Sequence, residues 1–211
     1  MLAAFIAALA ALTATVGDLL MLYVSNSRRP EFSLPAIPAV SLQVGGVLGV
    51  LAIPLYAWGY HAASRIVEAA SRRASRAVFW LGSIGAVLGA VIHGLTALQI
   101  HADLAAGAVA RDPLSSVASW GPTILVLWAL AAVSILLASF VFGWVATRGP
   151  DSTHRLVGLA NPALVMLVLV IVGMTTPLLR SFLAPAAPNL AHVVFFGACV
   201  WAHLAGRRRD R

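Results

Sequence analysis

Long apolar segments constrain the fold of this chain more than any other feature. Each is close to the roughly 20 residues that a helix needs to cross the hydrocarbon core of a bilayer. The segments cover about 2–24, 40–60, 78–100, 122–147, 157–179 and 187–205. Of the 211 residues, 61% are hydrophobic and only 10% are charged, whereas soluble domains carry about 25% charged residues. We therefore expect an all-α, polytopic membrane protein, a single domain over 1–211 that forms a bundle of six transmembrane helices.

The basic residues predict how the helices are oriented in the membrane. All of them are arginines, and most lie in the second loop, the fourth loop and the C-terminal tail. Cytoplasmic loops carry such an excess of basic residues, so both termini are expected to be cytoplasmic and the protein to be a multi-pass protein of the cell membrane. The arginines are expected to contact anionic lipid headgroups. Nucleic acid is not an expected partner.

The chain lacks the motifs of several common kinds of site. Cys199 is the single cysteine, so neither a disulfide framework nor a thiolate metal site can form. HExxH, GxSxG and the paired aspartates that bind magnesium diphosphate do not occur. We expect no metal and no cofactor. One alternative stays open, because a bis-histidine haem needs only two facing imidazoles, and His93 and His192 could supply them.

Polar residues from several helices are expected to meet at one depth. If successive helices cross in alternating directions, Asp18 lies in the outer half of the first helix and His93 at a similar depth in the third. The other expected members of this layer are Gln43, Thr175, Thr176, Arg180, Asn189 and His192, with His101 and Asp103 at the outer end of the third helix. Ionisable residues inside a membrane normally face a cavity or a partner. The sequence thus predicts a polar cavity in the extracytoplasmic half.

General acid–base chemistry fits such a cavity. A carboxyl group in hydrocarbon favours its protonated form, so Asp18 could hold and deliver a proton. We expect protonation of an alkene or epoxide, or double-bond isomerisation, in a lipophilic, isoprenoid-like substrate that enters from the membrane. Asp18 would be the acid, and His93 its orienter or the base. The residues expected to bind the substrate are Gln43, Trp128, Thr175, Arg180, Asn189 and His192.

Simpler roles remain open for the same residues. Asp18 could pair with a neighbouring helix to fix the fold, and His93 could be a neutral core histidine bonded to a carbonyl. Arg180 could extend to the headgroups, as long basic side chains do. The alternative function is non-enzymatic, namely a carrier or binding protein for a small lipophilic or anionic ligand.

Several short motifs resemble known proteins. They are "GDLLMLY" in the first helix, the histidine that ends the second, "VIHG" in the third, "NPALVM" in the fifth and "PNLAHVVFF" in the sixth. Together they resemble small six-helix bacterial membrane proteins of unknown function. A fainter likeness is to the integral membrane terpene cyclases of bacterial indole-sesquiterpene and fungal meroterpenoid pathways, which use membrane-embedded acidic residues as proton donors. That likeness implies that Asp18 is the donor. This chain departs from those enzymes in having no second carboxylate within a predicted span, and Glu31 in the first outer loop would supply one only by folding inward.

Overall fold

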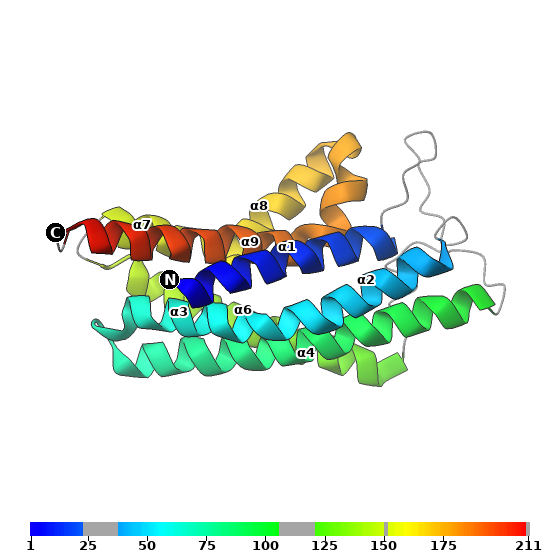
Figure 1. The fold of residues 1–211 in the computed structure, drawn as a ribbon, viewed down its shortest axis with the longest axis horizontal. Helices are drawn as coiled ribbons and strands as arrows, with labels where there is room; N and C mark the ends of the chain where they lie inside the picture. The colour runs from blue at the N-terminus through cyan, green and yellow to red at the C-terminus, as the bar shows by residue number, and fades with distance from the viewer. Residues whose placement is uncertain (23–37, 106–120, 150–151, 210–211) are drawn as a thin grey trace.

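The computed structural model describes residues 1–22, 38–105, 121–149 and 152–209, and all the regular structure within these ranges is helical. The elements are α1 (Leu2–Leu22), α2 (Ala39–Ala52), the 3₁₀ turn η2 (Ile53–Leu55), α3 (Tyr56–Glu68), α4 (Arg72–Ala105), α6 (Gly121–Ala146), α7 (Ser152–Leu159), α8 (Pro162–Thr175) and α9 (Pro177–Arg209). Figure 1 shows their order. The prediction of an all-α chain is confirmed for these residues.

Several of these helices are long and apolar enough to cross a membrane. The stretches are Leu2–Met21, Ala39–Glu68, Arg72–Ala102, Gly121–Ala146 and Pro185–Gly206, and the α7–α8 pair passes the same test together, although the two helices are bent by 54°. The described residues thus contain five such helices, or six if the bent pair is one span.

The predicted segment 157–179 is not one straight helix. Asn161 accepts a hydrogen bond from the backbone N–H of Leu164 and begins α8, and Pro162 occupies the first turn. Proline suits that position because its missing N–H would have no helical partner there. At the other end α8 stops at Thr175, and α9 begins at Pro177, earlier than the predicted 187. Figure 1 shows the first turns of α9 standing at a steep angle to the rest, where Pro185 and Pro188 interrupt the helical hydrogen bonds.

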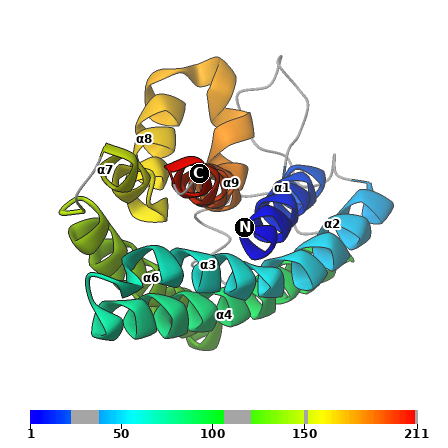
Figure 2. The same cartoon turned by 60° about the vertical axis from the view of Figure 1, so that its left-hand side comes forward.

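Helices α1 and α9 lie side by side at the centre of the molecule. Figure 2 shows them within an arc that runs from α2 through α3 and α4 to α6. Helix α1 contacts α2 and α3 as well as α9, and α4 contacts α2, α3 and α6. The N-terminus, the α3–α4 turn and the C-terminal turns of α9 all lie toward one end of the molecule (Figure 1).

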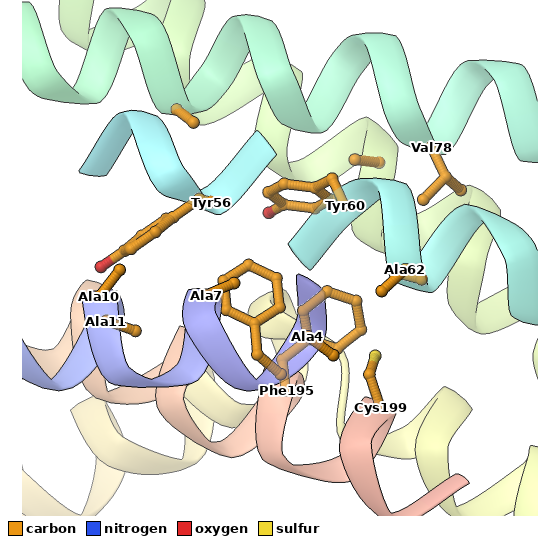
Figure 3. Packing of buried hydrophobic residues seen from close by; sticks show 14 of the residues in the cluster. Ala4, Ala7, Ala10, Ala11, Tyr56, Tyr60, Ala62, Val78, Phe195 and Cys199 are labelled. Carbon is orange, nitrogen blue, oxygen red and sulfur yellow. The ribbon is translucent and has the colours of Figure 1, made fainter. Parts of the chain in front are cut away.

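Small residues and aromatic rings form the buried core. Helix α1 fully buries Ala4, Ala7, Ala11 and Ala14, and small residues allow helix backbones to approach closely. Rings from α3, α6 and α9 belong to the same buried cluster as these alanines. Figure 3 shows Tyr56 and Tyr60 of α3 on one side of the cluster and Phe195 of α9 extending into it from another helix. The neighbouring rings meet edge-on or tilted, for example Tyr60 and Phe196 with centroids 5.6 Å apart. Such arrangements suit the ring quadrupole.

The outside of the structure is apolar, whereas many polar side chains are buried. Trp80, Phe140 and Met174 are 61%, 65% and 76% exposed. The buried polar side chains are Thr15, Asp18, Ser64, Ser75, His93, Thr96, Ser139, Thr153, Asn161, Asn189 and His192. Soluble proteins seldom bury ionisable groups while exposing so much apolar surface. This distribution suggests a membrane protein.

Candidate functional site

Asp18 is the centre of a buried hydrogen-bonded network. Its carboxylate lies one turn before the end of α1, and Asp18, His93 and Asn189 are 6%, 6% and 7% exposed. Asn189 in α9 donates from Nδ2 to Asp18 Oδ2 at 2.6 Å. His93 in α4 places Nδ1 3.4 Å from Asp18 Oδ1. Both carboxylate oxygens therefore face a polar group on another helix.

The network continues beyond these three residues in both directions. The Tyr56 hydroxyl in α3 donates to Asn189 Oδ1 at 2.6 Å, and Figure 3 shows this ring extending toward α1. On the other side, His93 Nε2 lies 3.1 Å from the carbonyl oxygen of Gly45 in α2. The chain of contacts thus joins α2, α4, α1, α9 and α3.

The partners determine where most protons of this network reside. The Gly45 carbonyl can only accept, so His93 Nε2 must carry a proton. Asn189 donates to Asp18 Oδ2, and Tyr56 donates to Asn189. The protonation of the Asp18–His93 pair is not determined by its partners. With one proton the pair is either a carboxylic acid with a neutral imidazole or a carboxylate with an imidazolium, and without it the pair is a carboxylate facing a neutral imidazole. The pair can therefore hold one exchangeable proton.

A second buried histidine, His192 in α9, lies next to this network. His192 Nδ1 is 2.7 Å from the carbonyl oxygen of Pro188, and His192 Nε2 is 2.8 Å from the Tyr60 hydroxyl. The acceptor-only carbonyl requires a proton on Nδ1, so Nε2 of the neutral ring accepts from Tyr60. His93 and His192 are thus held as opposite tautomers. The Tyr56 ring packs against His192 with centroids 4.8 Å apart.

The local sequence explains how these groups reach one another. Pro54 lies in the first turn of η2, and after it Tyr56 and Tyr60 are four residues apart, on one face of α3. Glycines in α2 leave room for the neighbouring helices. A Cβ built on Gly45 would lie 2.6 Å from the Gly17 oxygen in α1, and one built on Gly49 would lie 2.0 Å from the His93 ring.

The structure brings together four of the residues predicted for the site. Asp18, His93 and Asn189 share the network, and His192 follows Asn189 by one turn in α9. Side chains of α1, α4 and α9, which correspond to the first, third and sixth predicted segments, therefore meet in the structure.

The other predicted wall residues point away from the network. Gln43, Trp128, Thr175 and Arg180 are all exposed. Gln43 precedes Gly45 by two residues, which places it on a different face of α2. The Thr175 hydroxyl donates to the Ile171 carbonyl of its own helix. His101 is also exposed, and Glu31 and the Asp103 side chain lie outside the part of the chain that the structure describes.

The site predicted from the sequence did not include Tyr56, Tyr60 or Gly45. A tyrosine near the end of a transmembrane helix is also typical of the aromatic belt at the membrane interface. Its residue type alone therefore did not indicate a place in the site. The four-residue spacing of the two tyrosines could have indicated them, because it places both phenol groups on one face of the helix, where a neighbouring helix can contact both. Asn189 and His192 show the matching three-residue spacing in α9.

The described residues do not form a ready metal or haem site. Among them, no group of three or more His, Cys, Asp or Glu side chains is placed to hold a metal ion. A bis-histidine haem would need one ring nitrogen of each histidine as an iron ligand. Both nitrogens of His93 and of His192 instead lie next to polar partners, so haem ligation would require this network to rearrange.

A family model now places the chain among related sequences. The model of DUF6796, a family of unknown function, matches residues 1–205. The chain belongs to this family. No curated protein and no solved structure matches the chain. The family supports the expected likeness to proteins of unknown function, whereas the fainter likeness to terpene cyclases finds no support in it.

Proposed function

We propose that this family member is an integral membrane protein of six spans with both termini in the cytoplasm. The exposed apolar side chains and buried polar ones support membrane insertion. In this arrangement the bent α7–α8 pair is the fifth span. The arginines Arg65, Arg72, Arg73 and Arg76 flank the α3–α4 turn, at the end of the molecule where the N-terminus lies. The positive-inside rule places that end in the cytoplasm.

We further propose that Asp18 and His93 form an acid–base centre that acts on a lipophilic, isoprenoid-like substrate. The observation that carries this proposal is the 3.4 Å approach of Asp18 Oδ1 and His93 Nδ1, two groups that can exchange a proton, within a buried network whose other polar groups have hydrogen-bond partners. A structural contact between helices needs no such exchangeable position. A general acid does need one, since it must release a proton and recover it.

The reaction that fits this centre conserves protons. Asp18 transfers its proton to one carbon of a double bond, whose electron pair forms the new C–H bond, and the neighbouring carbon becomes a carbocation. The carbocation then loses a proton from an adjacent carbon to the Asp18–His93 pair, either directly or after ring closure. The product is an isomerised or cyclised alkene, and the acid is restored. During this interval the amide of Asn189 stabilises the carboxylate through its hydrogen bond to Oδ2.

The depth of the centre fits a substrate dissolved in the membrane. Asp18 lies about 24 Å along α1 from Leu2, at 1.5 Å per residue, and the hydrocarbon core is roughly 30 Å thick. The centre then lies in the outer half of the bilayer, where the double bonds of a lipid tail are accessible and water is scarce. Low polarity strengthens the interaction of the pair with a developing charge.

Deuterium incorporation tests the acid–base proposal directly. Lipid that co-purifies with the protein in mild detergent is identified by mass spectrometry, and that lipid, or a panel of linear polyprenols where none is retained, is incubated with the protein in D₂O. We expect carbon-bound deuterium in the product. Asp18→Asn should abolish its formation, whereas Glu68→Gln should not, because Glu68 pairs with Arg65 at the cytoplasmic turn.

The same experiment separates the proposal from its alternative. A carrier would retain lipid without any carbon-bound deuterium appearing, and Asp18→Asn would change only the amount retained. Undiminished deuterium incorporation by Asp18→Asn would show that Asp18 is not the acid. A Soret absorption band in the purified protein would favour the haem alternative instead.

A further inference from the structure

Helix α2 contacts the His93 ring at two glycines, Gly45 and Gly49. The Gly45 carbonyl oxygen lies 3.1 Å from Nε2. At Gly49, one turn further along α2, an added Cβ would lie 2.0 Å from both Cδ2 and Nε2 and 2.5 Å from Cε1. The imidazole thus occupies the space that any side chain at position 49 would fill.

The backbone conformation at position 49 does not require a glycine. Among the described residues the one glycine with positive φ is Gly121, and Gly49 lies within the regular helix α2. Alanine has the higher helix propensity at such a position. The feature that only glycine provides here is the space next to the backbone, and His93 is what fills that space. Gly45 differs, since an added Cβ there would meet Gly17 and Met21 of α1.

The Gly45 carbonyl also selects one tautomer of His93. A carbonyl oxygen has two lone pairs, so it can accept from the imidazole as well as within its own helix. The Nδ1–H tautomer would place the Nε2 lone pair against this oxygen, which is unfavourable in a buried site. The Nε2–H tautomer leaves the Nδ1 lone pair facing Asp18, where it can accept the carboxyl proton.

We propose that the α2 segment Gly45–Gly49 positions His93 for proton exchange with Asp18, with the Gly45 carbonyl fixing the Nε2–H tautomer and Gly49 providing the space for the ring. This inference rests on the proposed acid–base function, and it makes Gly49 a positioning residue rather than a catalytic one. The glycine pair then determines which nitrogen faces the acid, while Asp18 and His93 exchange the proton.

Nitrogen-15 NMR of the histidine-labelled protein in lipid tests the inference without any substrate. The chemical shifts distinguish the two neutral tautomers and the imidazolium, and a spectrum of His93→Gln identifies the His93 signals among the 6 histidines. We expect Nε2 of His93 to be protonated, and His192 to show the opposite tautomer, with its proton on Nδ1. A neutral His93 protonated on Nδ1 in the wild-type protein would overturn the inference.

A glycine variant then tests the role of the space. Gly49→Ala should remove the distinct Nε2–H signature of His93 and leave its two tautomers in exchange, while the His192 signals stay unchanged. Gly89→Ala is the matched control, because Gly89 lies one turn before His93 in α4 and its added Cβ would make an ordinary 3.4 Å contact with Ile53. That control should preserve the wild-type signature.

The outcomes also separate this inference from the proposed function. If Gly49→Ala folds and keeps the wild-type His93 signature, the positioning role is wrong. If Gly49→Ala does not fold, the wild-type tautomer still decides the claim about Gly45. Wild-type protein with the expected tautomer but no deuterium incorporation from D₂O into any product would contradict the acid–base function and leave the geometry of His93 intact.

Discussion

Asn189 Nδ2 lies 2.6 Å from Asp18 Oδ2, and this hydrogen bond joins α9 to α1 across 171 positions of sequence. The same amide accepts from the Tyr56 hydroxyl at 2.6 Å, so its orientation is determined by one donor and one acceptor. Asn189 thus connects three helices through two hydrogen bonds, one of them to a charged or protonated carboxyl group. Removing either partner leaves a buried polar atom unsatisfied.

A double-mutant cycle between Tyr56→Phe and Asn189→Leu should measure this coupling. We expect each single change to lower the free energy of unfolding by about 1 kcal/mol or more, because it leaves a buried partner without its hydrogen bond. Their interaction energy should be about 0.5–2 kcal/mol, the range for interhelical hydrogen bonds in membranes. Reversible unfolding in mixed detergent micelles provides the measurement.

Tyr60→Phe is the matched control for this cycle. It removes a hydroxyl from the same face of α3, but that hydroxyl bonds to His192 rather than Asn189. Its interaction energy with Asn189→Leu should therefore be within about 0.5 kcal/mol of zero. Equal coupling of both tyrosines to Asn189 would contradict the assigned hydrogen bonds.

The aromatic core gives a second prediction, at Gly82 in α4. A Cβ at this position would lie 2.1 Å from the Tyr60 ring, which is buried and held by the His192 hydrogen bond. Gly82→Ala should lower the free energy of unfolding by about 1–3 kcal/mol, as overpacking does. A fluorescence-monitored thermal melt in detergent would show the loss as a lower Tm.

Gly197→Ala is the control for that change. Gly197 lies in α9 and an added Cβ meets nothing within 4 Å, so alanine should leave Tm unchanged or raise it through its better helix propensity. A higher Tm for Gly82→Ala than for Gly197→Ala would mean that the Tyr60 ring does not pack on α4 as described.

The helices predicted best are those whose ends coincide with the ends of an apolar segment. The segments 2–24 and 122–147 match α1 (Leu2–Leu22) and α6 (Gly121–Ala146) closely. Helix α4 begins at Arg72, before the predicted residue 78, because a helix continues past the hydrocarbon core while hydropathy marks only its apolar part. The fifth segment was predicted as continuous because its composition stays apolar through the Asn161 cap and the break before Pro177.

The site was predictable in depth but not in rotation. Counting residues from the helix ends placed Asp18, His93 and Asn189 in one layer, and the structure connects them. Depth does not determine which side of a helix faces inward, so Gln43 and Arg180 were assigned to the same layer although both are exposed. Tyr56 was missed because its partner is 133 positions away. The four-residue spacing of Tyr56 and Tyr60 indicates a shared helix face but does not identify that partner.

The bend between α7 and α8 gives a third prediction, at Asn161. Its Oδ1 accepts from the Leu164 N–H, and its Nδ2 donates to the Gly158 carbonyl at 2.8 Å. Asn161→Ala should lower the free energy of unfolding by roughly 1–2 kcal/mol, through the loss of the cap and the unsatisfied carbonyl. Asn161→Ser keeps a neutral cap oxygen but not the donor, so its Tm should lie between the wild-type and Asn161→Ala values. A Tm for Asn161→Ser at or below that of Asn161→Ala would show that the cap is unimportant.

Membrane orientation gives the last prediction, and the single native cysteine makes it measurable. Cys199 is fully buried, so a membrane-impermeant maleimide should label the wild-type protein poorly. Ala70 and Ala102 are both exposed, near the opposite ends of α4. With the arginine-rich α3–α4 turn in the cytoplasm, Ala102→Cys should react in intact cells and Ala70→Cys only after lysis. The reverse pattern would place the termini outside, and labelling of both variants in intact cells would mean that α4 does not cross the membrane.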